Sequence, residues 1–221
     1  MSRIVVAISG GSGAVYGRRL AQVLAAAGHE IHLTVSDAAR KVIAAELGLN
    51  LNLRDADDVV AHLVGLPVTY HHYQNVAAPI ASGSFPTDAM VVAPCSMGTI
   101  GRIASGVSTG LIDRAADVCL KERRRLILVP RETPYSEIHL ENMLRVTRAG
   151  AIVLPASPGF YGRPERVDQL VDFVVGRILD HLGVENTLAP RYGGVPGPQS
   201  SVLSPQSRPP TPPGGAGREP D

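Results

Sequence analysis

Five short stretches of the chain are mostly apolar, and longer segments of mixed character separate them. The stretches cover residues 4–8, 31–35, 90–93, 126–129 and 151–154. Hydrophobicity that is continuous rather than alternating predicts strands buried on both faces. Between the stretches, apolar residues recur at helical spacing over 20–27, ahead of Gly28, and over 167–178, after Pro164. Strand and helix in turn predict an α/β, doubly wound (Rossmann-like) parallel sheet with helices on both faces. In such three-layer folds, ligands bind at the carboxyl ends of the strands.

The pattern ends before the chain does. Eight of the 18 prolines lie in residues 196–221, a stretch with several glycines and almost no apolar residues. Such a segment buries too little apolar surface to offset the entropy lost on ordering. We therefore expect one folded domain over residues 1–191 and a Pro/Gly-rich disordered tail over residues 192–221.

Composition narrows the class of protein. Lys and Arg number 21 against 20 Asp and Glu, a net charge of +1, so nucleic acid and anionic membranes are not expected partners. The two cysteines, Cys95 and Cys119, cannot build a disulfide framework, and the first residues lack a signal-peptide layout. No apolar run approaches the roughly 20 residues that span a bilayer. We expect a cytoplasmic protein with free thiols.

The first strand runs into a glycine-rich turn, Ser9-Gly10-Gly11-Ser12-Gly13. Free amides at the start of the following helix can hold phosphate or a flavin edge, although the same residues would also suit a simple tight turn. The second strand is followed by Ser36, where a nicotinamide site would want an acidic residue. Ser36 could bind a ligand hydroxyl or phosphate, or cap the next helix.

Later strand ends carry similar chemistry. Ser96 and Thr99 follow the third strand, so two strand ends could converge on one anion. Cys95 beside them has no adjacent histidine to activate it, which favours a small buried thiol over a nucleophile. Arg131 and Glu132 follow the fourth strand, as a ligand edge or as a local ion pair. The seven histidines show no metal-ligand spacing, so no metal is expected.

A set of motifs occurs in a fixed order between residues 4 and 191. These are the Gly-Ser-Gly turn, Ala81-Ser82-Gly83-Ser84, Pro94-Cys95-Ser96-Met97, Arg114-Ala115-Ala116-Asp117-Val118, Lys121-Glu122-Arg123-Arg124, Pro130-Arg131-Glu132-Thr133-Pro134, His139-Leu140-Glu141-Asn142-Met143 and Pro158-Gly159-Phe160-Tyr161. Each motif alone is weak, but the ordered set closely resembles the flavin prenyltransferase family of the UbiX type.

The resemblance implies a transferase that uses reduced FMN as a substrate and needs no metal. Dimethylallyl monophosphate would alkylate the flavin at N5, and ring closure at C6 would give prenylated FMN. That product is the cofactor of UbiD-type decarboxylases, one of which serves ubiquinone biosynthesis. The family forms dodecamers with active sites between subunits, so a homo-dodecamer is expected.

The resemblance also assigns residues, in three groups. FMN would be bound by Gly10, Gly11, Ser12, Ser36, Ser96, Met97, Gly98, Thr99 and Arg131. Dimethylallyl phosphate would be bound by Arg114, Lys121, Tyr161 and Arg177. The catalytic group would be Glu132, as the acid that helps phosphate depart, Ser12, which helps relay the proton lost from N5, and Glu46, which with Glu132 would lie beside the prenyl phosphate.

The chain departs from its relatives at two positions, and two other functions compete. Val76 stands where many relatives have a tryptophan, and Gly98 replaces a lysine found in some.

A flavin-dependent cysteine decarboxylase is the nearest alternative function, but its active-site histidine and Pro-x-Met-Asn segment are not evident. A non-enzymatic FMN-binding protein is the other, and it would have no use for a set of residues that binds prenyl phosphate. The chain also lacks a group suited to stabilising an aryl carbanion, so decarboxylation of an aromatic acid is not expected.

Overall fold

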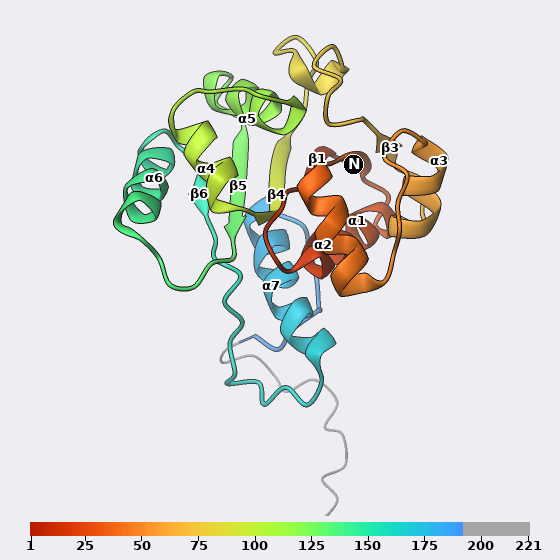
Figure 1. The fold of residues 1–221 in the computed structure, drawn as a ribbon. Coiled ribbons are helices and arrows are strands. Elements are labelled where there is room, and N and C mark those ends of the chain that lie inside the picture. The colour runs from red at the N-terminus through yellow and green to blue at the C-terminus, as the bar shows by residue number, and fades with distance from the viewer. Residues whose placement is uncertain (192–221) are drawn as a thin grey trace, which may run out of the picture. The chain divides into compact units, whose positions relative to one another are not determined.

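Parallel strands form one sheet at the centre of the computed structural model, which describes residues 1–191 (Figure 1). Within those residues the sheet has six strands in the order β3-β2-β1-β4-β5-β6. The strands are β1 Arg3–Ile8, β2 Glu30–Val35, β3 Thr69–Tyr70, β4 Ala89–Cys95, β5 Arg125–Pro130 and β6 Ile152–Val153. The expected tail, residues 192–221, lies outside the described residues.

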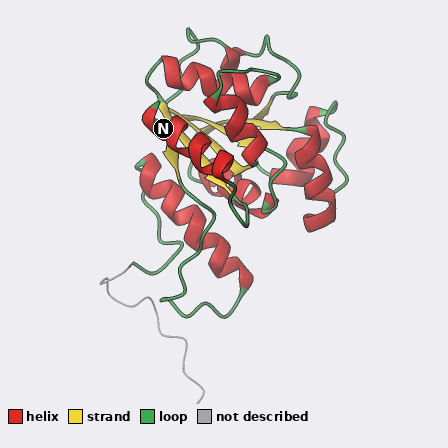
Figure 2. Ribbon diagram, turned by 60° about the vertical axis from the view of Figure 1, so that its left-hand side comes forward, coloured by secondary structure: helices red, strands yellow, loops and turns green. Residues whose placement is uncertain are grey.

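Helices cover both faces of this sheet (Figure 2). The chain-order bounds are α1 Ala14–Ala26, α2 Asp37–Leu47, α3 Ala56–Val59, the π-helical η1 Val60–Val64, the 3-10 helix η2 Pro79–Ala81, α4 Met97–Ala104, α5 Leu111–Lys121, α6 Glu137–Arg148 and α7 Val167–Leu182. Val6 and Ile8 of β1 pack in one core with α1, α2 and α7. Val5 and Ala7 pack in a second core with α4, α5 and α6. The predicted three-layer α/β fold is confirmed.

The elements follow the hydrophobic pattern closely. All five apolar stretches contain strands, and in the first four the residues on both faces are buried in one core or the other. The fifth forms only the two-residue β6, whose Ile152 and Val153 are half-buried. The helix predicted over 20–27 is α1, which ends just before Gly28, a residue in the left-handed region at φ 80°. The helix predicted over 167–178 is α7. β3 was not predicted, because its two residues are not a buried apolar run: Thr69 is exposed and Tyr70 half-buried.

The topology determines where the site lies. Neighbouring strands are all parallel, so their carboxyl ends meet at one edge of the sheet. The glycine turn, Ser36, Ser96 and Arg131 each follow a strand directly at this edge. None of the helices in the described part of the chain is long and apolar enough to cross a membrane.

Candidate functional site

The glycine turn is held against two other strand ends. A Cβ at Gly10 would lie 2.7 Å from the Cβ of Ala38, at the start of α2, so no larger residue fits without movement. A Cβ at Gly11 would lie 3.4 Å from the Cβ of Pro94 in β4. Gly13 has φ 102°, which favours glycine. The turn is thus close-packed, and it leads into the start of α1, the kind of position at which backbone N–H groups bind a phosphate or flavin edge.

Ser9 ties the ends of β1 and β4 together. Its hydroxyl donates to the carbonyl of Pro94 at 3.0 Å, and the Ser96 N–H donates to the same hydroxyl at 2.7 Å. Ser9 is buried. The sequence quoted this residue within the turn but gave it no role, because its partners lie 85 and 87 positions away.

Two serines cap the helices that begin at this edge. The Ser36 hydroxyl accepts from the Ala39 N–H at 3.0 Å and caps α2. The Ser96 hydroxyl accepts from the Thr99 N–H at 3.4 Å, caps α4, and lies 3.0 Å from the Thr99 hydroxyl. Capping was one of the two roles left open for Ser36. Because both helix starts face the same edge, their positive ends reinforce each other toward an anion.

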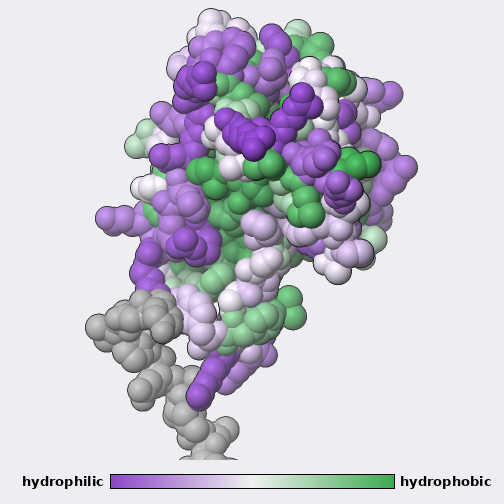
Figure 3. Space-filling model, turned by 90° about the vertical axis from the view of Figure 1, so that its left-hand side faces the viewer, coloured by the Kyte–Doolittle hydropathy of each residue, from purple (hydrophilic) through white to green (hydrophobic). Residues whose placement is uncertain are grey.

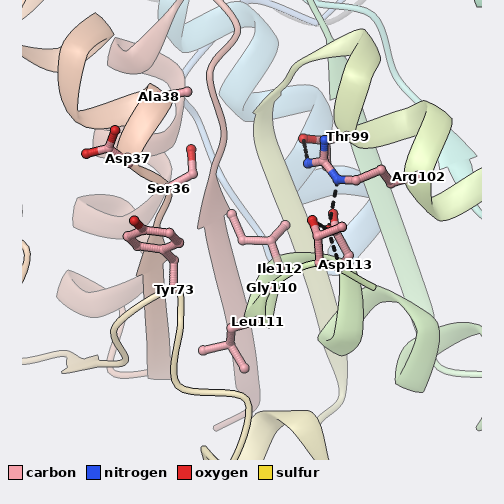
Figure 4. A pocket seen from close by; sticks show the side chains of 11 residues that line it. Ser36, Asp37, Ala38, Tyr73, Thr99, Arg102, Gly110, Leu111, Ile112 and Asp113 are labelled. Atoms are coloured by element: carbon pink, nitrogen blue, oxygen red, sulfur yellow. Dashed lines mark hydrogen bonds and ion pairs between the residues drawn. The ribbon is translucent and has the colours of Figure 1, made fainter. Parts of the chain in front are cut away.

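A cavity of about 250 Å³ lies between these helix starts (Figure 4). Ser36 lines one side and Thr99 the other, while Gly110 at the start of α5 lines its floor. The two strand ends that the sequence placed near one anion therefore share one cavity. Its size and polar lining suit the phosphate and polyol part of a flavin nucleotide.

An ion pair in this cavity was missed by the sequence reasoning. Arg102 donates through Nε to Asp113 Oδ2 at 2.8 Å and through Nη2 to the Thr99 hydroxyl at 3.1 Å. Asp113 is only 3% exposed, and Thr109 donates to it from both its N–H and its hydroxyl. The one available signal was spacing, since Arg102 follows Thr99 by three residues and shares its helix face.

Two of the three expected catalytic residues lie at the glycine turn: Ser12 is part of it, and Glu46 accepts hydrogen bonds from the N–H groups that follow it. Arg131 donates through Nε to the Ser12 carbonyl at 3.4 Å. The Glu46 carboxylate accepts from the N–H groups of Gly13, at 3.0 and 3.1 Å, and Ala14, at 2.9 Å. Glu132 is next to Arg131 in the chain, and its carboxylate accepts from the Thr133 N–H at 3.1 Å.

Tyr16 adds a phenol that the sequence reasoning did not select. A Cβ at Gly13 would lie 2.8 Å from the Tyr16 ring. Burial raises the pKa of Tyr16, the charge of Arg131 lowers it and that of Glu46 raises it, so all three groups share one environment. The phenol remains protonated at neutral pH and can donate a hydrogen bond.

The four residues expected to bind prenyl phosphate do not form one cluster within a single chain. Arg114 on α5 donates to the Ala81 carbonyl at 3.3 Å, and Lys121 at the end of α5 pairs with Glu122. The core under α5 is on the opposite face of the sheet from the core under α7.

Tyr161 precedes α7 and packs against the helix that carries Arg177. The Tyr161 ring packs edge-on against Phe173 at 5.7 Å, and Phe173 precedes Arg177 by one helical turn. Arg177 itself pairs with Asp180 at 2.8 Å. One chain therefore presents the four residues in two pairs, Arg114 with Lys121 and Tyr161 with Arg177, on opposite faces of the sheet.

The thiols and histidines show no catalytic arrangement. Both cysteines are free and buried. Burial raises the pKa of the Cys95 thiol well above its ordinary value, which keeps it protonated and unreactive. His32 is buried, and its Nδ1 lies 2.8 Å from Nε2 of His71. Across residues 1–191, no group of three or more His, Cys, Asp or Glu could hold a metal ion.

Comparison with known proteins gives a consistent family. The family model described as Flavoprotein matches residues 1–179. A flavin prenyltransferase UbiX of Halalkalibacterium halodurans is 47% identical over 190 residues, covering 85% of this chain and 92% of the relative. The flavin prenyltransferase UbiX of Pseudomonas aeruginosa is 46% identical over 196 residues, covering 86% and 94%.

Solved structures agree. The crystal structure of AnUbiX (PadA1) in complex with FMN and dimethylallyl pyrophosphate has a TM-score of 0.79 and 44% identity, covering 88% of this chain and 99% of that one. A dodecameric FMN-dependent Ubix-like decarboxylase from Escherichia coli O157:H7 has a TM-score of 0.77 and 44% identity, covering 87% and 100%. The cysteine decarboxylase TvaF has a TM-score of 0.54 at 17% identity, covering 69% and 89%, a likeness of fold alone.

Proposed function

This chain belongs to the Flavoprotein family and, within it, to the flavin prenyltransferases of the UbiX type, and on that premise we propose that it joins the dimethylallyl group of dimethylallyl monophosphate to reduced FMN. The observation that carries the proposal is the 44% identity, over 88% of this chain, to a protein crystallised with FMN and dimethylallyl pyrophosphate. The features expected of such a site, a glycine cradle and a polar cavity, lie at one sheet edge here.

FMN fits the residues at this edge. The amides of Gly10, Gly11 and Ser12 would face the flavin, and Arg131 would lie beside it through its contact with Ser12. The cavity between Ser36 and Thr99 would take the ribityl phosphate. Ser96, Met97 and Gly98 directly precede Thr99 at the start of α4, so they would lie next to it. When bound, reduced FMN supplies the nucleophilic N5 and the C6 position at which the new ring closes.

Transfer breaks the bond between the prenyl carbon and the phosphate oxygen, so the protein must stabilise the departing phosphate. Tyr161 and Arg177 would grip it from one subunit, and Arg114 and Lys121 from another. Glu132 would donate a proton to the leaving phosphate. Ser12 would relay the proton lost from N5, close to the Glu46 carboxylate that the turn amides hold in place.

Because this proposal takes the phosphate-binding residues from two subunits, the protein would be a homo-oligomer. The Escherichia coli relative is described as dodecameric, and we propose a homo-dodecamer here. α6 carries three exposed apolar side chains, Ile138, Leu140 and Leu144. Apolar area is also plain on the face that Figure 3 shows. An apolar surface of this kind suits contact with another copy.

The product would be used by a UbiD-type decarboxylase, in ubiquinone biosynthesis or in the breakdown of aromatic acids. We place the protein in the cytoplasm, because both cysteines are free, as is usual in a reducing compartment.

Reconstitution of such a decarboxylase tests the proposal. The chain is incubated without oxygen with reduced FMN and dimethylallyl monophosphate, and a UbiD-type apoenzyme is then added. Decarboxylation of an unsaturated acid should appear only when the chain and the prenyl donor are both present. Activation that is independent of the donor, or no activation with an apoenzyme that an established prenyltransferase can activate, would contradict it. Parallel incubation with a peptide ending in cysteine tests the rival activity, and we expect no decarboxylated peptide.

A further inference from the structure

Arg102 occupies the proposed FMN phosphate cavity without being one of the residues that the family resemblance supplied. Its guanidinium bridges two elements, donating to Thr99 on α4 and to Asp113 on α5. These contacts use Nε and Nη2. A Cβ at Gly98 would lie 3.8 Å from the third nitrogen, Nη1, so the guanidinium borders the phosphate-binding start of α4. Figure 4 shows this pair across the cavity from Ser36.

Helix starts around Arg102 favour an anion, and each of the two carboxylates that line the cavity is paired with an arginine: Asp113 with Arg102, and Asp37 with Arg40. Three helices begin at this cavity, since Ser36 caps α2, Ser96 caps α4 and Gly110 precedes α5. Their partial positive ends add to the charge of Arg102. A phosphate monoester presents the oxygens that the planar guanidinium fork binds well.

Asp113 supplies a second, independent observation. Its Oδ2 accepts three hydrogen bonds, one from Arg102 and two from Thr109. Its Oδ1 is buried and has no hydrogen-bond partner among the described residues. A buried carboxylate oxygen left unpaired is costly, so a ligand that donates a hydrogen bond there would be favoured. Phosphate has no such donor at neutral pH, but a sugar-alcohol hydroxyl has one.

We propose that Arg102 binds the FMN phosphate and that Asp113 both orients Arg102 and accepts a hydrogen bond from a ribityl hydroxyl. The pair thereby selects a flavin that carries both a phosphate and a polyol chain, and it disfavours riboflavin. Arg102 and Asp113 act on binding and selectivity, not on the chemical step. The proposal rests on the proposed function only in taking FMN as the ligand.

Binding of three flavins to the purified full chain tests it. FMN, riboflavin, which lacks the phosphate, and lumiflavin, which also lacks the ribityl chain, are titrated in oxidised form without prenyl donor. Arg102→Ala should raise the dissociation constant for FMN about tenfold or more and leave that for riboflavin nearly unchanged, because a charge-assisted contact is lost only with the phosphate ligand. Arg102→Lys should recover part of the loss.

Asp113→Asn should raise the dissociation constant for riboflavin more than that for lumiflavin, and should raise that for FMN most of all. The matched control is Arg145→Ala, which also removes an arginine from the last turn of a helix but lies on α6. It should leave all three dissociation constants unchanged. Arg102→Ala leaves the 3% exposed Asp113 carboxylate without its ion-pair partner, whereas Arg102→Lys keeps a positive charge beside it. The FMN-to-riboflavin selectivity of Arg102→Lys, expected to be lower than that of the wild type, therefore tests the inference even if Arg102→Ala or Asp113→Asn does not fold.

An FMN-to-riboflavin selectivity that is the same in Arg102→Ala as in the wild type would overturn this inference. So would equal loss of both flavins. Because no prenyl donor is present, these results are separate from the proposed activity: a wild-type chain that selects FMN but transfers no prenyl group would contradict the proposed function alone.

Discussion

Glu132 and Arg131 place opposite charges side by side where β5 ends. Arg131 contacts the Ser12 carbonyl, while the Glu132 carboxylate stays beside its own backbone at Thr133. Arg131 therefore contacts the glycine turn, whereas the contacts of Glu132 do not hold that turn. This separation suits a carboxyl group that acts on the leaving phosphate rather than on flavin binding.

Glu132→Gln should slow prenyl transfer by roughly 100-fold, as expected for loss of a general acid. The dissociation constant for FMN should change by less than about twofold, because no flavin contact is removed. Single-turnover rates and flavin titration measure the two quantities. The control Glu137→Gln, exposed at the start of α6, should alter neither. Equal loss of rate and of FMN affinity would count against the acid role.

Cys119 makes the stability of the folded chain depend on pH. Burial raises the pKa of this thiol from 9.0 to about 11. The folded state therefore retains a proton that the unfolded chain loses above pH 9, so stability is fully present below that pH and falls as the pH rises.

As the pH rises from 8 to 10, the free energy of unfolding should fall in both proteins. The fall should be about 1 kcal/mol larger in the wild type than in Cys119→Ala, which lacks this thiol. Urea unfolding at both pH values measures the difference. Identical pH dependence in the two proteins would show that Cys119 does not titrate in this way.

At the scale of elements, α1 begins without a side chain of its own at the cap. Gly13 holds the capping position, and Glu46 from α2 supplies the acceptor for the Gly13 and Ala14 N–H groups. The carboxylate also faces the positive end of the helix. Glu46 thus fixes the turn that carries Ser12, a positioning role in addition to its expected place near the prenyl phosphate.

Glu46→Ala should lower the free energy of unfolding by about 1 kcal/mol, the usual cost of losing a helix cap. Chemical denaturation measures the loss. Glu141→Ala, at an exposed position on α6, is the comparison and should stay within about 0.5 kcal/mol of the wild type. A Glu46→Ala chain as stable as the wild type would mean that the cap contributes nothing.

The elements also explain what the sequence could and could not predict. Buried apolar runs predicted the parallel strands, and therefore the edge at which Ser36, Ser96 and Arg131 lie, because residues that follow parallel strands share one edge. Glu46 was assigned by resemblance, but its contact with Gly13 spans 33 positions and has no local signal. The Arg102–Asp113 pair was missed for the same reason, because it joins two helices.

At the scale of the whole molecule, the residues expected to bind prenyl phosphate are divided between two helices that cover opposite faces of the sheet. Arg114 and Lys121 belong to α5, and Tyr161 and Arg177 lie at α7. The family resemblance assigned these residues to one set, but the sequence could not show that the sheet would separate α5 from α7. The proposed site therefore needs at least two copies of the chain.

Mixed oligomers test this division. Lys121→Ala and Arg177→Ala should each be nearly inactive alone, because each removes a phosphate contact from every site. Co-expressed, they should regain up to roughly a quarter of wild-type activity, since random assembly pairs a wild-type α5 with a wild-type α7 at about that frequency. Activity of the tagged, co-purified mixture that does not exceed that of either variant alone would contradict a site shared between copies.

The central claim is that the chain alkylates a flavin, and the mass of the flavin tests it most directly. Purified protein is incubated without oxygen with reduced FMN and dimethylallyl monophosphate, with the pyrophosphate in a parallel sample, and the extracted flavin is analysed by mass spectrometry. The account predicts a flavin heavier by one five-carbon prenyl unit, formed only when enzyme and donor are both present. A flavin of unchanged mass with both donors would contradict it.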